Sequence, residues 1–109
     1  MQSRATTRQD GNVAIVDLSG SIDSGLLRKT IQELVAAGQN KVLLNIEHVT
    51  YVDSAGMGEM VSACSTVRKL GGDLKLANPQ ARIAHLLQMT KLSTVLAIFA
   101  NEQEALKSF

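Results

Sequence analysis

The chain has 109 residues, 45% of them hydrophobic and 19% charged, and this length and composition predict one globular domain over residues 1–109. The formal net charge of +1 and the aromatic content of 3% argue against nucleic acid as a partner, because no basic stripe with interleaved aromatic residues is present. The single cysteine excludes an internal disulfide and a multi-cysteine metal site.

The first predicted elements are two strands joined by a tight turn. Residues 3–8 are polar and suit an exposed edge strand, whereas the apolar run 13–18 suits a buried strand. Asp10-Gly11-Asn12 between them is a tight-turn signal, so the two strands are expected to pair antiparallel. Residues 19–23 are predicted to form a loop.

An amphipathic helix and a buried strand are predicted next. Ser24 is placed to cap the helix, and Gly38 is placed to end it. The uninterrupted apolar run 42–46 is typical of a central parallel strand that helices cover. The apolar positions of the helix recur at i, i+4, i+7 and i+8, which are Leu27, Ile31, Leu34 and Val35.

A second helix is predicted from about Gly56 to Leu70, and Gly71-Gly72 ends it. Residues 73–77 then alternate as in a half-exposed strand. Arg68 and Lys69 are interpreted as solvated charges at the end of this helix. The residues expected on its apolar face are Met57, Met60, Val61, Cys64 and Val67.

The last predicted elements are a helix, a strand and a short terminal helix. Asn78-Pro79 is interpreted as a cap followed by proline at the first helical position, and this helix is expected to run to about Met89. Residues 95–99 indicate a buried strand. Asn101, with Glu104 three residues later, matches a capping box that opens the terminal helix.

This order of elements predicts an α/β domain with a mostly parallel sheet and an antiparallel N-terminal edge strand. Right-handed crossovers would pack the helices mainly on one face of the sheet. Residues 1–10 lack the apolar core of a secretory signal, and the apolar run 95–100 is far too short to cross a bilayer. A cytoplasmic protein without direct membrane insertion is therefore expected, and no motif indicates a cofactor or a metal.

The candidate functional residues gather where the second helix begins, in Asp53-Ser54-Ala55-Gly56-Met57-Gly58. Helix N-termini carry unpaired N–H groups and a partial positive charge, so a phosphate on Ser54 would be accepted there at little structural cost. A purely structural role is also open, because Ser54 and Asp53 are both favoured N-caps, although neighbours cannot both cap optimally. Gly56 and Gly58 are interpreted as sites of close packing and of open approach to Ser54.

Motifs along nearly the whole chain carry a resemblance to a known family: Gly20-Ser21-Ile22-Asp23, the hexapeptide 53–58, and Gly71-Gly72-Asp73-Leu74-Lys75-Leu76 followed by Asn78-Pro79. In this order they resemble the STAS domain, and more narrowly the bacterial anti-sigma factor antagonists. Ala55 stands where this family has the second of two serines or an alanine, so Ser54 is the only hydroxyl in the hexapeptide.

The resemblance implies a non-enzymatic switch. The unmodified antagonist binds an anti-sigma factor that is also a serine kinase, the kinase phosphorylates the antagonist and the complex dissociates, and a PP2C-type phosphatase resets the cycle. Ser54 matches the phosphorylated serine, and Asp23 matches an acidic residue beside it. The partner-binding residues that the resemblance implies are Asp23, Asp53, Ser54, Ala55, Gly56, Met57 and Gly58.

Other functions remain as alternatives. The same family includes stand-alone subunits of lipid-transport ABC transporters and components of stressosome-like scaffolds. A serine hydrolase is disfavoured, because the chain has no Gly-x-Ser-x-Gly elbow. His48 and His85 are interpreted as surface residues, Cys64 as a buried filler, and Asp23 equally well as a turn residue that bonds its own backbone.

Overall fold

Strands and helices alternate along the chain, and the computed structural model describes residues 3–22 and 25–109. The elements are β1 (Arg4–Asp10), β2 (Val13–Ile22), α1 (Leu26–Ala36), β3 (Lys41–Val52), α2 (Ser54–Lys69), β4 (Asp73–Ala77), α3 (Ala81–Met89), the 3-10 helix η1 (Leu92–Thr94), β5 (Ala97–Phe99) and α4 (Glu102–Lys107). No helix in these residues is long and apolar enough to cross a membrane.

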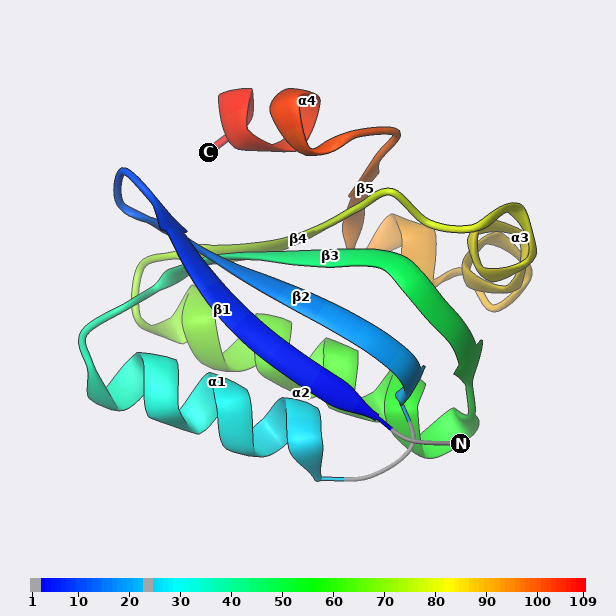
Figure 1. Ribbon diagram of the computed structural model, residues 1–109, viewed down its shortest axis with the longest axis horizontal. Helices are drawn as coiled ribbons and strands as arrows, with labels where there is room; N and C mark the ends of the chain where they lie inside the picture. The colour runs from blue at the N-terminus through cyan, green and yellow to red at the C-terminus, as the bar shows by residue number, and fades with distance from the viewer. Residues whose placement is uncertain (1–2, 23–24) are drawn as a thin grey trace.

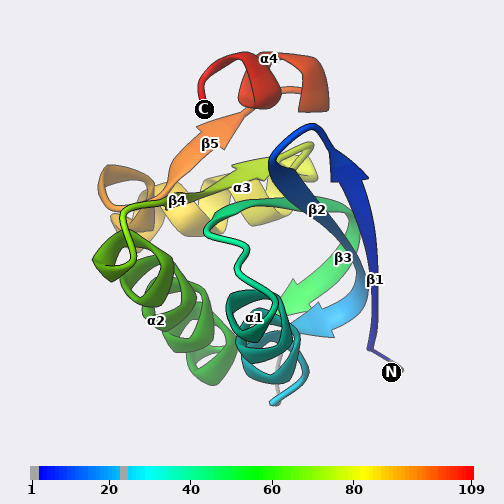
Figure 2. The ribbon, with the colours of Figure 1, turned by 90° about the vertical axis from the view of Figure 1, so that its left-hand side faces the viewer.

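The strands form one five-stranded sheet in the order β1-β2-β3-β4-β5 (Figure 1). Strand β1 is antiparallel to β2, and all other neighbours are parallel. The predicted α/β class, the mostly parallel sheet and the antiparallel edge strand are therefore confirmed. Helices α1 and α2 lie side by side on one face of the sheet, whereas α4 lies on the other (Figures 1 and 2).

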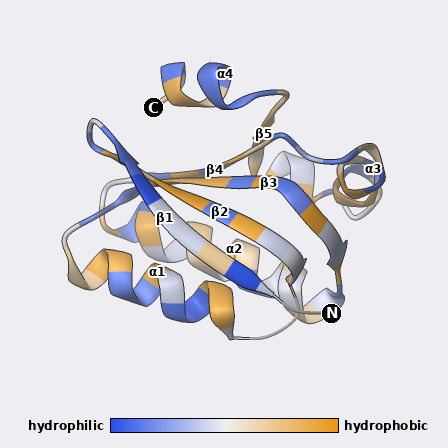
Figure 3. Ribbon diagram, viewed as in Figure 1, coloured by the Kyte–Doolittle hydropathy of each residue, from blue (hydrophilic) through white to orange (hydrophobic). Residues whose placement is uncertain are grey.

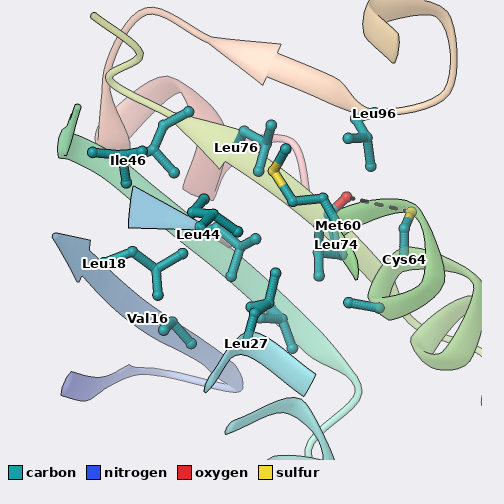
Figure 4. Packing of buried hydrophobic residues seen from close by; sticks show 14 of the residues in the cluster. Val16, Leu18, Leu27, Leu44, Ile46, Met60, Cys64, Leu74, Leu76 and Leu96 are labelled. Atoms are coloured by element: carbon teal, nitrogen blue, oxygen red, sulfur yellow. Dashed lines mark hydrogen bonds between the residues drawn. The ribbon is translucent and has the colours of Figure 1, made fainter. Parts of the chain in front are cut away.

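The main core lies between the sheet and the helices α1, α2 and α3. Alternate positions of β3, such as Val42, Leu44 and Ile46, belong to this core. Figure 3 shows hydrophobic segments along the strands and on the helices. Figure 4 shows how side chains from several strands meet Leu27 of α1 and Met60 of α2. Fully buried strand residues in this cluster include Val16, Leu44, Leu74 and Leu76.

Helix α4 covers a smaller apolar cluster on the opposite face, built around Ile15, Leu43 and Ala105. The predicted cap of this helix is confirmed, because the Asn101 side chain accepts a hydrogen bond from the Glu104 N–H at 2.8 Å. Ion pairs tie α4 to the sheet edge: Arg8 contacts Asp17 at 2.6 Å and Glu102 at 2.7 Å. The hydrogen bonds from Arg8 lower the pKa of the Asp17 carboxyl.

The predicted loop over 19–23 is wrong for its described part, because β2 continues to Ile22. The reason is a longer partner strand: β3 runs on to Val52, and its backbone pairs with residues 19–22 across two register shifts. Gly20, with a φ of 81°, lies between those shifts and adopts a conformation that suits glycine. Ser24, the expected cap of α1, lies outside the described residues, and α1 follows Gly25.

The expected start of α3 is also wrong. Asn78 does not cap the helix, which begins at Ala81 with Gln80 at the N-cap. Asn78 instead turns the chain after β4 in a left-handed conformation, with a φ of 61°, and its N–H donates to the Phe99 carbonyl at 3.1 Å. The buried strand predicted over 95–99 is shorter and only half-buried, because η1 precedes β5 and the side chain of residue 95 is exposed. The strand predicted as half-exposed over 73–77 is instead buried from residue 74 onward.

Gly56 allows α2 to pass very close to the end of β2. A Cβ atom at this position would lie 1.6 Å from the Ile22 carbonyl oxygen, so any side chain would force the helix away from the strand. A Cβ atom at Gly58, half a turn further, would meet nothing within 4 Å. The predicted close packing therefore belongs to Gly56, and the open approach belongs to Gly58.

We predict that Gly56→Ala lowers the free energy of unfolding by about 3 kcal/mol, because the new methyl group cannot avoid a backbone carbonyl. The matched variant Gly58→Ala is expected to raise it by up to about 1 kcal/mol, because alanine favours helix more than glycine does. Urea unfolding of the two variants checks this pair. Equal stabilities would contradict the close approach.

Candidate functional site

Ser54 is the first residue of α2, and its side chain is exposed. Asp53 precedes it in an extended conformation and caps the helix: its Oδ1 accepts a hydrogen bond from the Gly56 N–H at 2.7 Å. The Asp53 carbonyl accepts the first helical hydrogen bond, from the Met57 N–H at 2.9 Å. Because Asp53 is the cap, the Ser54 hydroxyl is not needed for that task. Ser54 itself is exposed at the helix entrance.

The outward residues of the hexapeptide are small. Ala55 and Gly58 are exposed together with Ser54, whereas Gly56 is buried and Met57 is half-buried. A larger exposed side chain, that of Tyr51 at 52% exposure, lies at the end of the strand that leads into α2. The helix entrance thus presents an uncluttered surface on which another protein could approach the Ser54 hydroxyl closely.

The end of β3 that leads to Ser54 is braced by α3. The register shifts between β2 and β3 leave backbone carbonyls of β3 outside the regular ladder, and side chains at the start of α3 bind them. Gln80 Nε2 donates to the Glu47 carbonyl at 3.0 Å, and Arg82 Nη2 donates to the Thr50 carbonyl at 2.5 Å. These bonds fix the strand end from which the site projects.

Few charged side chains of the described residues lie near the helix entrance. The first turn of α2 carries no acidic residue beyond the capping Asp53, so the partial positive charge of the helix N-terminus is only partly offset. A hollow of about 500 Å³ between α1 and α2 begins at Ala55 and Gly58, and it is lined by one cation, Arg28, and one anion, Glu59. An anion added at Ser54 would therefore be stabilised mainly by the helix dipole and less by cationic side chains.

The two histidines and the cysteine lie where the sequence predicted them, on the surface and in the core respectively. Asp23 lies outside the described residues, so its position beside Ser54 stays a prediction. His48 is exposed, with its Nε2 at 4.0 Å from Glu47 Oε2, and His85 is exposed on α3. Cys64 is buried, and burial raises the pKa of its thiol, as expected of a filler.

The sequence alone indicated no separate role for Arg82, Arg28 or Tyr51. Local patterns predicted Arg82 only as part of a helix, because nothing in α3 itself reveals that β3 leaves carbonyls for it to bind. Among the described residues, no group of three or more His, Cys, Asp or Glu side chains could hold a metal ion.

Known proteins share this sequence pattern and fold. Residues 4–105 match the model of the STAS domain. The anti-sigma-B factor antagonist of Bacillus subtilis (strain 168) is 30% identical over 106 residues, which cover 94% of this chain and 96% of that protein.

Two solved structures are also similar. An anti-sigma factor antagonist from Mycobacterium paratuberculosis has a TM-score of 0.87 at 17% identity, over 98% of this chain and 93% of its own. The Bacillus cell fate determinant SpoIIAA in its phosphorylated form has a TM-score of 0.71 at 19% identity, over 96% of this chain and 98% of its own. These identities support the fold alone.

The capping geometry predicts different effects for two adjacent residues. Asp53→Ala should lower the free energy of unfolding by about 1 kcal/mol, because it removes the acceptor of the Gly56 N–H. Ser54→Ala should change it by less than about 0.5 kcal/mol, as is usual for an exposed side chain. Asp53→Asn serves as control, since asparagine caps as well as aspartate. Thermal unfolding measures all three, and a larger loss for Ser54→Ala would refute the assignment of the cap.

Proposed function

We propose that this chain, which belongs to the STAS domain family, is an anti-sigma factor antagonist switched by phosphorylation of Ser54. In its unmodified form it binds an anti-sigma factor that is also an ATP-dependent serine kinase. Phosphorylation by this kinase ends the complex, and a PP2C-type phosphatase restores the hydroxyl. The chain is the substrate of both enzymes in the cytoplasm and not itself an enzyme.

The observation that carries the proposal is the exposed Ser54 hydroxyl beside a helix entrance that Asp53 already caps. A serine that capped the helix would be engaged with the backbone, and its modification would disturb the fold. Here the two tasks fall on different residues. The similarity to an anti-sigma-B factor antagonist over most of the chain supports the same role.

The fold is suited to carry a phosphate at this position. Phosphorylation adds roughly −1.5 to −2 charges and three strong acceptor oxygens. The unpaired N–H groups and the dipole at the start of α2 stabilise such a charge, and the exposure of Ser54 lets water solvate the rest. The same fold in the phosphorylated form of SpoIIAA supports this expectation. The effect of the phosphate therefore falls on the partner.

A partner that lies over the small residues Ala55 and Gly58 must desolvate whatever Ser54 carries. A hydroxyl costs little to cover, whereas an unpaired phosphate costs several kcal/mol when water is excluded. The carboxylate of Asp53, one residue away, adds repulsion to any acidic group of the partner. A penalty of roughly 3–4 kcal/mol is enough to weaken binding about 10²- to 10³-fold.

We predict that an anti-sigma factor of the kinase class from the source organism transfers one phosphate from ATP to the purified protein, at Ser54. Ser54→Ala should block the transfer and keep its affinity for the anti-sigma factor. Ser54→Asp should bind the anti-sigma factor about 10²-fold more weakly. Mass spectrometry locates the phosphate, and isothermal titration calorimetry measures the affinities of the two variants for each such kinase.

The control for added charge is Gln103→Glu, an exposed position on α4 across the sheet from the site. It should bind like the wild type. Phosphate at another residue, or equal affinities for Ser54→Ala and Ser54→Asp, would contradict the proposal. Purification with an ABC transporter in place of an anti-sigma factor would favour the transporter-subunit alternative.

A further inference from the structure

The side of α2 that faces η1 carries an apolar groove next to the Ser54 site. A hollow of about 490 Å³ flanks the first half of α2, with Met57, Val61 and Leu92 among its lining residues. A second hollow, of about 340 Å³, is lined by Val61, Val95, Arg68 and Lys69. Val61 lines both hollows, so the two adjoin each other along α2. We name them together the α2–η1 groove, defined by Met57, Val61, Arg68, Lys69, Leu92 and Val95.

The apolar side chains that line this groove are only partly covered: Met57 and Leu92 pack against the main core on one side and remain partly exposed on the other. Met57 and Val61 were predicted to face the interior with Met60, yet both are only half-buried, whereas Met60 is fully buried. On the opposite wall Leu92 is half-buried, and Val95 is 41% exposed. Apolar surface that gathers in a hollow beside a candidate site marks an interaction surface more often than isolated exposed residues do.

The charged residues that line the groove, among those the structure describes, are both cations. Arg68 is occupied: it contacts Asp73 at 2.9 Å and donates to the Val95 carbonyl at 3.0 Å, which holds the groove wall against α2. Lys69 is exposed in the last turn of α2 and belongs to no ion pair of the described residues. The far end of the groove therefore favours an acidic occupant.

The hollow on the other side of α2 has a different character. Its lining includes one cation and one anion, Arg28 and Glu59, so it selects no sign of charge. The α2–η1 groove is apolar near Ser54 and basic at its far end. From Met57 to Lys69 it follows the helix for roughly 18 Å, which equals about three turns of a helix laid beside it.

We propose that the α2–η1 groove receives an amphipathic helix of the anti-sigma factor. Apolar side chains of that helix, spaced at i, i+4 and i+7, lie against Met57, Val61 and Leu92, and its acidic residues lie over Lys69. This inference rests on the proposed function and names the partner surface of the same site. Because the groove begins one turn from Ser54, the docked helix covers the hydroxyl and meets the phosphate directly.

The test uses the purified anti-sigma factor that phosphorylates the wild-type protein, titrated with variants by calorimetry. Val61→Glu should weaken binding about 30-fold or more, because it places a charge on the apolar floor. Lys69→Glu, a surface change that leaves the fold intact, should weaken binding about 5- to 10-fold at low salt and remove most of its salt dependence. Thermal unfolding confirms that each variant is folded.

Matched controls lie close by. Leu70→Glu adds the same charge at an exposed apolar residue that lines neither hollow, and Lys107→Glu reverses a lysine on α4, on the far face of the sheet. Both should bind like the wild type.

Two failures can be told apart in one titration series. Wild-type affinity for both Val61→Glu and Lys69→Glu, with Ser54→Asp still weakened, would overturn the groove and leave the switch standing. Wild-type affinity for Ser54→Asp would instead refute the switch. Sedimentation gives a third outcome. The wild type could form a dimer that Val61→Glu dissociates, while the affinity for the anti-sigma factor stays unchanged. In that case the groove holds a second copy of the chain, and the inference is wrong.

Discussion

The contact of Gly56 with the backbone of Ile22 places the first turn of α2 directly against the end of β2. This contact requires glycine, and it sets the direction in which the preceding residues leave the sheet. Asp53 then lies where it can cap the helix, and Ser54 projects outward. The bracing of β3 by Arg82 fixes the strand on the other side of the turn. A rigid scaffold thus holds one exposed hydroxyl.

The division of labour between Asp53 and Ser54 explains how such a hydroxyl can be modified without harm to the fold. Asp53 caps the helix N-terminus of the unmodified protein, and the dipole of α2 favours an added negative charge. We therefore expect a phosphate to change the surface and to leave the core as it is. In our proposal the loss of affinity comes from desolvation and repulsion at the interface, and the α2–η1 groove supplies the attraction that the phosphate overcomes.

Periodicity and turn chemistry predicted most of the fold. The hairpin at Asp10-Gly11-Asn12, the parallel strand at 42–46 and the cap at Asn101 were all visible in local patterns. What local patterns could not predict depends on distant pairing. Residues 19–21 are small and lack an apolar side chain, yet they form strand because the backbone of β3 pairs with them.

The sequence predicted where the candidate site lies but not its detailed geometry. The motif around Ser54 stood out because it joins a buried strand to a helix, but the sequence could not decide between Ser54 and Asp53 as the cap. Gly56 and Gly58 looked alike in the sequence, and only the neighbouring strand distinguishes them. The α2–η1 groove was hidden because Leu92 and Val95 belong to a segment that was predicted in part as a strand.

Amide hydrogen exchange, with phosphoserine incorporated at position 54, tests most directly whether the phosphate acts on the partner and not on the fold. The unmodified and phosphorylated proteins should show the same protection throughout the sheet and in α1, α3 and α4, with differences confined to the first turns of α2. Broad loss of protection in the sheet of the phosphorylated protein would contradict the account, because it would show that the modification unfolds the domain.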